Sequence, residues 1–66
     1  MAVLKVIEIM ANSEKSWEDA TAKAIKKASK SIKNIRSAWV QDQSVSVNGG
    51  KVVDYRVNLK VSFEVS

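Results

Sequence analysis

The last fourteen residues of the chain alternate between apolar and polar side chains almost without interruption. The apolar positions are Val53, Tyr55, Val57, Leu59, Val61, Phe63 and Val65. A repeat of two residues is typical of a β-strand that buries one face and exposes the other to water. At about 3.3 Å per residue, this strand extends for roughly 45 Å. Its length constrains the fold, because whatever covers its apolar face has to be comparably long.

A single helix is predicted to cover this strand. Ser16 is a suitable N-cap, Asp19 three residues later approximates a capping box, and Ser13 is a rival cap one turn earlier. The stripe that follows at helical spacing contains Trp17, Ala20, Thr21, Ala24, Ile25, Ala28 and Ile32. Such a helix has about sixteen residues and is roughly 24 Å long, with Asn34 as a suitable stop. Because the strand is nearly twice as long, we expect other copies of the chain to complete the core.

The remaining segments predict two more strands. Residues 3–10 are rich in Val and Ile, and a polar break follows at residues 11–15. Residues 35–47 form the second strand, and Asn48-Gly49-Gly50 signals a tight turn into the last strand, because glycine adopts positive φ easily. The predicted order is strand, helix, strand, strand, an α+β fold in a single domain of residues 1–66.

The second predicted strand changes its apolar face partway along. One face carries Ser37, Trp39, Gln41 and Gln43, and the other carries Ala38, Val40, Asp42 and Ser44. Val45 and Val47 then fall on the Trp39 face. This pattern predicts a β-bulge near residues 42–44, or a change of packing partner.

The composition removes several classes of function. The 66 residues include no Cys and no His, which excludes disulfides, thiolate metal sites and the commonest general base. The seven carboxylates are scattered and no phosphate-binding glycine loop is present, so we expect no enzyme. A chain this short needs additional support, and oligomerisation remains available. No apolar stretch spans a bilayer and the N-terminal run lacks a signal-peptide layout, so we expect a cytoplasmic protein without a membrane partner.

Five of the eleven basic residues gather on the predicted helix, and the formal net charge is +4. They are Lys23, Lys26, Lys27, Lys30 and Lys33. Such a set either binds anions or forms a solvated outer face near the C-terminal end, where the helix dipole favours cations. No RNA-binding aromatic signature accompanies the lysines. We therefore favour the solvated face and keep a basic nucleic-acid-binding module as the last alternative.

Trp39 and Arg56 are the residues that most need a functional explanation. If Ala38 and Val40 pack on the helix, Trp39 points away from it and serves a subunit interface or a stacking platform for a planar ligand. A regular hairpin ladder places Asp42 opposite Arg56, as a cross-strand ion pair. The suspected bulge instead moves Arg56 to the Trp39 side, where it faces an anionic or planar ligand.

These features together resemble the dodecin family. The resemblance covers essentially the whole chain and rests on Lys5-Val6-Ile7-Glu8-Ile9, Asn12-Ser13 followed by Ser16-Trp17-Glu18-Asp19-Ala20, and Val61-Ser62-Phe63-Glu64. It implies a three-stranded antiparallel sheet wrapped around one helix, and a hollow homododecamer with its helices outward. It also implies that the protein binds a small molecule such as riboflavin, FMN or coenzyme A, and sequesters it without turnover.

The flavin site of the family departs from its usual residues in this sequence. Flavin-binding dodecins stack a Trp at the start of the second strand on the flavin ring and hydrogen-bond the ring with a Gln of the third strand. Those positions are Ser37 and Arg56 here. Trp39 and Gln43 share the predicted face of Ser37, so the candidate ligand-binding residues are Ser37, Trp39, Gln43 and Arg56. Some members that lack the Trp have been described with metal ions, and this chain is closer to that branch. The alternative to a flavin store is therefore a flavin-free shell that binds metal ions or no small ligand.

Overall fold

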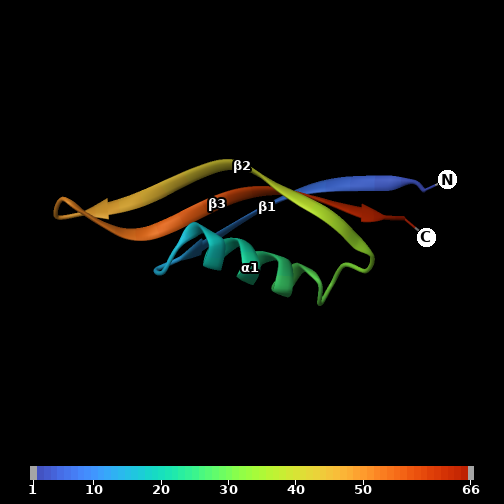
Figure 1. Cartoon of the computed structure of the whole chain (residues 1–66), viewed down its shortest axis with the longest axis horizontal. Coiled ribbons are helices and arrows are strands. Elements are labelled where there is room, and N and C mark those ends of the chain that lie inside the picture. The colour runs from blue at the N-terminus through green and yellow to red at the C-terminus, as the bar shows by residue number, and fades with distance from the viewer. Residues whose placement is uncertain (1, 66) are drawn as a thin grey trace.

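The computed structural model describes residues 2–65, which form three strands and one helix (Figure 1). The elements are β1 (Leu4–Ser13), α1 (Trp17–Ala28), β2 (Ile35–Asn48) and β3 (Lys51–Glu64), in the predicted order. The strands pair antiparallel in the order β1-β3-β2, so the alternating strand lies at the centre of the sheet. Within this part of the chain, α1 is too short and too polar to cross a bilayer.

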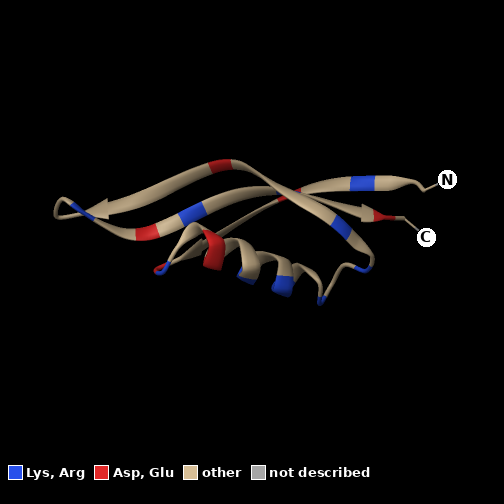
Figure 2. Ribbon diagram, in the orientation of Figure 1, with Lys and Arg blue, Asp and Glu red and all other residues tan. Residues whose placement is uncertain are grey.

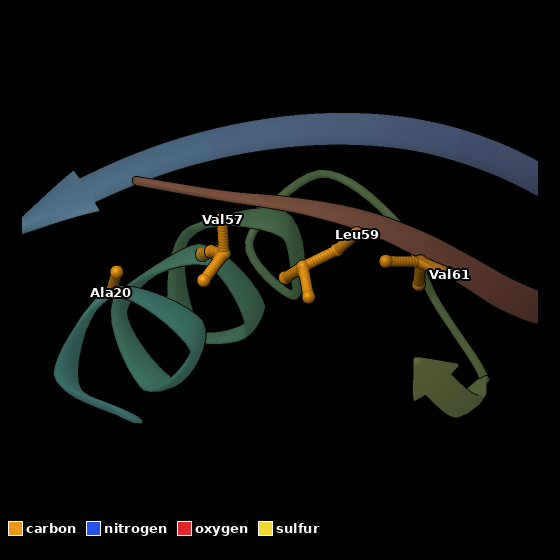
Figure 3. Packing of buried hydrophobic residues seen from close by; sticks show 5 residues of the cluster. Ala20, Val57, Leu59 and Val61 are labelled. Atoms are coloured by element: carbon orange, nitrogen blue, oxygen red, sulfur yellow. The ribbon is translucent and has the colours of Figure 1, made fainter. Parts of the chain in front are cut away.

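The core lies between α1 and the central strand β3. Val57, Leu59 and Val61 are fully buried on one side of β3 and point toward the helix (Figure 3). They pack with Ala20 and Ala24, whose small side chains let the helix lie close to the sheet. We call this side of the sheet the helix face. The other side is the open face, which on β3 carries Arg56, Asn58, Lys60 and Ser62.

The start of α1 is fixed by the predicted cap. Ser16 Oγ accepts a hydrogen bond from the backbone N–H of Asp19 at 3.0 Å. Ser13, the rival cap, instead donates its hydroxyl to the Asp19 carboxylate at 2.5 Å and is almost fully buried. Lys23 reaches the same carboxylate at 3.1 Å from one turn further along the helix. The Asp19 side chain therefore joins the end of β1 to the first turns of α1.

The helix is shorter than predicted. It ends at Ala28 after 12 residues, which correspond to about 18 Å. The hydroxyl and the backbone N–H of Ser29 both donate to the Ile25 carbonyl, at 2.8 Å and 2.9 Å, a side-chain-to-backbone bond that is more typical of helix ends than of helix interiors. Asn34, the predicted stop, lies further on with a positive φ of 64° and redirects the chain into β2.

β1 is longer than predicted, because residues 11–13 continue the strand where a polar break was expected. Ala11 pairs with Val57, and Ser13 pairs with Tyr55. The long central strand offers pairing partners along this whole segment, and these outweigh the weak strand preference of the polar residues.

The tight turn between β2 and β3 is confirmed. Gly49 and Gly50 have φ values of 60° and 76°. Two successive positive φ angles are typical of the turn that joins hairpin strands without splaying them. The hairpin strands pair from this turn onward, beginning with Asn48 and Lys51.

The pairing of β2 with β3 shifts by one residue between Val40 and Asp42. Gln41 is the extra residue at this β-bulge, which lies just before the predicted position. On the N-terminal side of the bulge, Trp39 pairs with Lys60 and therefore lies on the open face.

On the C-terminal side of the bulge, the side chains of β2 exchange faces. Gln43 pairs with Val57, and Val45 pairs with Tyr55. Because directly paired residues point to the same side of a sheet, Gln43 and Val45 lie on the helix face. The predicted bulge thus explains the position of Val45, whereas the prediction that Gln43 shares a face with Trp39 is wrong because the bulge lies before it, at Gln41.

Trp17 connects the helix to the edge strand β2. Its indole N–H donates to the carbonyl of Ser44 at 3.1 Å. Its ring meets Tyr55 edge-on, with centroids 5.2 Å apart and planes at 78°. The large residue of the helix stripe therefore holds β2 in place just beyond the bulge.

The sheet projects past the helix at both ends (Figure 1). The chain measures 51 Å along its longest axis but only 19 Å and 13 Å across. At the hairpin end, Val47 is 63% exposed and Val53 is 46% exposed, and at the opposite end Val3 is 64% exposed. A single copy of the chain thus leaves a large apolar surface in water.

Asp19→Asn is expected to destabilise the protein at neutral pH and to have little effect at low pH. The hydrogen bond from Ser13, followed by that from Lys23, holds the pKa of the Asp19 carboxyl below its ordinary value. A carboxyl with a lower pKa in the folded chain stabilises the fold above its unfolded pKa of about 3.9. That contribution is lost as the pH falls through the folded pKa. Thermal unfolding followed by circular dichroism between pH 7 and pH 2 measures the effect.

Glu18→Gln is the matched control, because it removes a carboxylate from the same helical turn and leaves the Ser13 contact intact. We expect the difference in melting temperature between wild type and Asp19→Asn to shrink progressively below about pH 4. A difference that stays constant down to pH 2 would show that the Asp19 charge does not stabilise the fold.

Candidate ligand-binding face

The open face is built from alternate residues of all three strands. Pairing aligns them in the rows Asn12–Arg56–Ser44, Met10–Asn58–Asp42, Glu8–Lys60–Trp39 and Val6–Ser62–Ser37. Side chains within a row are about 5 Å apart, and successive rows are roughly 7 Å apart along the strands. The face therefore presents a mixed set of acidic, basic, amide and aromatic groups.

Ser37 is engaged in a hydrogen bond across the strands. Its hydroxyl lies 2.6 Å from the hydroxyl of Ser62, which is 5% exposed. The pair fills this row with two small polar side chains. Ser37 therefore offers a planar ligand no ring on which to stack.

Trp39 is the aromatic group of the open face. It is 47% exposed and pairs with Lys60, which in turn pairs with Glu8. An exposed indole at the edge of a sheet, beside a charged residue, suits either contact with a second protein surface or stacking on a planar ligand. Trp39 therefore lies outside the core, and its position is compatible with both predicted roles.

Arg56 lies on the same face but far from Ser37. It pairs with Ser44 and not with Asp42, so the bulged register applies and the predicted Asp42–Arg56 ladder pair does not form. The partner of Ser37 on β3 is Ser62, six residues from Arg56, which corresponds to roughly 20 Å along the strand. One chain therefore does not bring Ser37 and Arg56 together, and a ligand that contacts both residues has to lie between two copies.

The strand register places Gln43 on the helix face and not beside Trp39. With Val40 and Trp17 it lines a shallow pocket between β2 and the start of the helix. It was placed beside Trp39 because an unbroken alternation was assumed up to that position. Of the four predicted site residues, Ser37, Trp39 and Arg56 therefore lie on the open face.

A second pocket on the sheet contains a residue that sequence reasoning missed. This pocket, of about 350 Å³, is lined by Met10, Asp42, Gln43, Ser44, Arg56 and Asn58. Asn58 Oδ1 is fully buried and has no hydrogen-bond partner within the described residues. A buried acceptor without a donor is uncommon and calls for a partner. Asn58 was inconspicuous in the sequence because only the register places it opposite Asp42.

The pocket contains oxygen atoms of the kind that hard cations prefer. Asp42 supplies a carboxylate, Asn58 an amide carbonyl and Ser44 a hydroxyl, whereas Arg56 adds a positive charge at the rim. Among residues 2–65, no three carboxylates or other strong ligands cluster tightly enough to hold a metal ion by themselves. Within one chain, the oxygen set therefore fits part of a cation site.

The fold and its open face define a small ligand-binding protein built on a β-α-β-β unit. A model of the Dodecin family matches residues 3–66, and the chain belongs to the dodecin family. The resemblance seen in the sequence is thereby confirmed.

The relatives include one whose name specifies its ligand. The chain is 42% identical over 65 residues to the calcium dodecin of Mycobacterium tuberculosis, which covers 98% of this chain and 92% of the relative. A crystal structure of calcium dodecin from that organism, described as calcium-chelating, matches with a TM-score of 0.84 at 43% identity over 97% of this chain and 91% of the other. A dodecin variant from Thermus thermophilus matches with a TM-score of 0.93 at 26% identity over 100% and 98% of the two chains.

Proposed function

We propose that this dodecin assembles into a homododecamer that binds and stores a divalent cation such as calcium on its open face. The observation that carries the proposal is the buried, unpartnered Asn58 Oδ1 beside the Asp42 carboxylate. The role is binding and not catalysis, and we place it in the cytoplasm. A bound cation would supply the positive partner that the Asn58 oxygen lacks, while Asp42 and Ser44 hold and orient it.

The assembly is supported by the distribution of apolar surface. Five hydrophobic residues are buried among those described, whereas eleven large hydrophobic residues are exposed. A core of this size does not offset the conformational entropy of ordering about 66 residues. The exposed residues concentrate on the strands beyond the reach of α1, so packing between copies is the available means of burying them.

The native mass is expected to be about twelve times the chain mass of 7.3 kDa. Light scattering coupled to size exclusion measures it directly. Val47→Asp and Val53→Asp place charges in the exposed hairpin end and are expected to weaken assembly, because a buried unpaired charge is costly. Lys51→Asp, at the polar turn of the same hairpin, is the control. A folded wild-type monomer would overturn the assembly.

The cation proposal is supported by the chemistry of the pocket and by the calcium-binding relative. Calcium takes six to eight oxygen ligands, including carboxylates, amide carbonyls and water. Asp42, Asn58 and Ser44 provide three such groups on adjacent strands. The remaining ligands come from water or from a second copy facing the same sheet. This need for further oxygens agrees with the isolated position of Asp42 in one chain.

Asp42→Asn is expected to weaken calcium binding at least about tenfold, because calcium affinity depends on the charge of the ligand set. Arg56→Gln is expected to strengthen it, since the guanidinium lines the same pocket and repels a cation. Titration calorimetry on chelator-treated protein compares both variants with wild type. A loss of affinity in Asp42→Asn together with a gain in Arg56→Gln is expected if both residues lie next to the bound calcium ion.

Glu18→Gln serves as the control for charge, because it removes one carboxylate from the exposed helix surface. Its calcium affinity is expected to match that of wild type. Equal losses in Asp42→Asn and Glu18→Gln, or weaker binding in Arg56→Gln, would reject the pocket as the cation site.

A flavin is the second candidate ligand, and the exposure of Trp39 is the observation that favours it. Against it, Ser37 stands where relatives stack a Trp, and Arg56 stands where they place a Gln. Loss of a stacking ring costs roughly 1–3 kcal/mol by analogy with base–aromatic stacking, or about one to two orders of magnitude in affinity.

We therefore expect wild-type protein to leave riboflavin fluorescence unquenched at micromolar concentration. The double variant Ser37→Trp and Arg56→Gln restores both groups and is expected to quench it. Strong quenching by wild type that disappears in Trp39→Ala would instead establish a stacking site shifted by two residues along β2.

A further inference from the structure

The outer side of α1 and the turn after it carry a cationic surface that the open-face site does not use. From Ala20 to Gln41 the chain has no acidic residue, and its six basic residues are all exposed. They are Lys23, Lys26, Lys27, Lys30, Lys33 and Arg36. Figure 2 shows positive segments along the helix and its following turn, with an acidic segment at the helix N-terminus.

Most of this charge has no partner within the chain. Lys23 pairs with Asp19 at 3.1 Å, and Arg36 approaches Glu64 at 3.4 Å. The other four lysines form no ion pair within residues 2–65. We call these four residues the lysine surface: Lys26, Lys27, Lys30 and Lys33. The favourable helix dipole explains two cations in the last turn of α1, but it does not explain an acid-free run of this length.

From this arrangement we infer that the lysine surface binds the phosphate backbone of nucleic acids without sequence preference. Four unpaired lysines concentrated on one exposed segment match the regular negative charge of a phosphate backbone. No aromatic side chain lies in the acid-free run before Trp39, and Trp17 uses its indole N–H on the Ser44 carbonyl. The surface therefore offers charge and no means of stacking on bases or reading them.

The geometry favours a nucleic acid over a membrane. Helices that lie on membranes insert an apolar face into the lipid. The apolar stripe of α1 is already committed to the sheet, where Ala20 and Ala24 are buried against Val57 and Leu59. The repetition of this surface rests on the proposed homododecamer: copies that pack through their exposed sheet ends leave the outer side of α1 uncovered, so one particle presents several lysine surfaces. Such repetition increases the apparent affinity for a long polyanion.

The test uses the assembled, full-length protein and two fluorescein-labelled oligonucleotides of unrelated sequence, as duplexes, in anisotropy titrations from 50 to 200 mM NaCl. Four phosphate contacts give a slope of about −3.6 in log affinity against log salt, which is roughly a 150-fold loss across this range. Contacts from more than one copy make the slope steeper. The two sequences are expected to bind equally well.

The decisive comparison is between two triple variants with the same net charge. Lys26→Gln, Lys27→Gln and Lys30→Gln together are expected to weaken binding at least tenfold at 50 mM NaCl and to reduce the slope by about 2.7. Lys5→Gln, Lys15→Gln and Lys51→Gln remove three exposed lysines elsewhere and are expected to change affinity less than threefold. Gln and Lys have similar helix propensities, so the first variant keeps its fold, which circular dichroism verifies.

Three results would overturn the inference. Absence of binding at 50 mM NaCl excludes it, and equal losses in the two triple variants show an effect of net charge alone. Tighter binding to vesicles of phosphatidylcholine and phosphatidylserine, with no competition by duplex, assigns the surface to anionic lipid instead. Calcium binding at the open face is expected to stay unchanged in the first triple variant, so the two sites are tested independently.

Discussion

The contact between α1 and the centre of β3 is the interaction on which the rest of the structure depends. Ala20 and Ala24 meet Val57, Leu59 and Val61, and small residues on the helix allow this close packing. The helix covers only about 18 Å of a strand that spans roughly 46 Å. The ends of the sheet are consequently uncovered, and their exposed apolar residues are the surface through which the proposed self-association would occur.

One extra residue in β2 decides what the open face contains. The bulge at Gln41 turns Gln43 and Val45 toward the helix and brings Asp42 and Ser44 to the open face. An unbroken ladder would have set Asp42 against Arg56 as an ion pair and hidden both charges from a ligand. Instead Asp42 lies opposite Asn58, whose buried oxygen is left without a donor. The pairing register of β2 with β3, and not a local sequence motif, thus brings the residues of this pocket together.

The parts of the fold that were predictable from sequence are those fixed by short-range physics. The period of two in β3, the Ser16 cap and the two glycines of the turn each act within a few residues, and all three appear in the structure. The early end of the helix at Ser29 was harder to predict from the sequence, because a serine hydroxyl can hydrogen-bond either to water or to a backbone carbonyl. Gln43 and Asn58 could not be placed correctly, since their faces depend on a one-residue shift between two strands.

Six of the eleven basic residues lie in a run without acidic residues, on the opposite side of the core from the carboxylates of the open face. The acidic residues of the open face, such as Glu8, Asp42 and Asp54, all belong to the sheet, whereas the run from Ala20 to Gln41 contains none. The two binding sites that we propose, one for a cation and one for a polyanion, therefore lie on opposite sides of the core formed by Val57 and Leu59. If the two surfaces were mixed, each would neutralise the other, because oppositely charged side chains within about 4 Å pair readily. In the proposed assembly, burial of the sheet ends between copies would keep the two surfaces apart and repeat each of them on every copy.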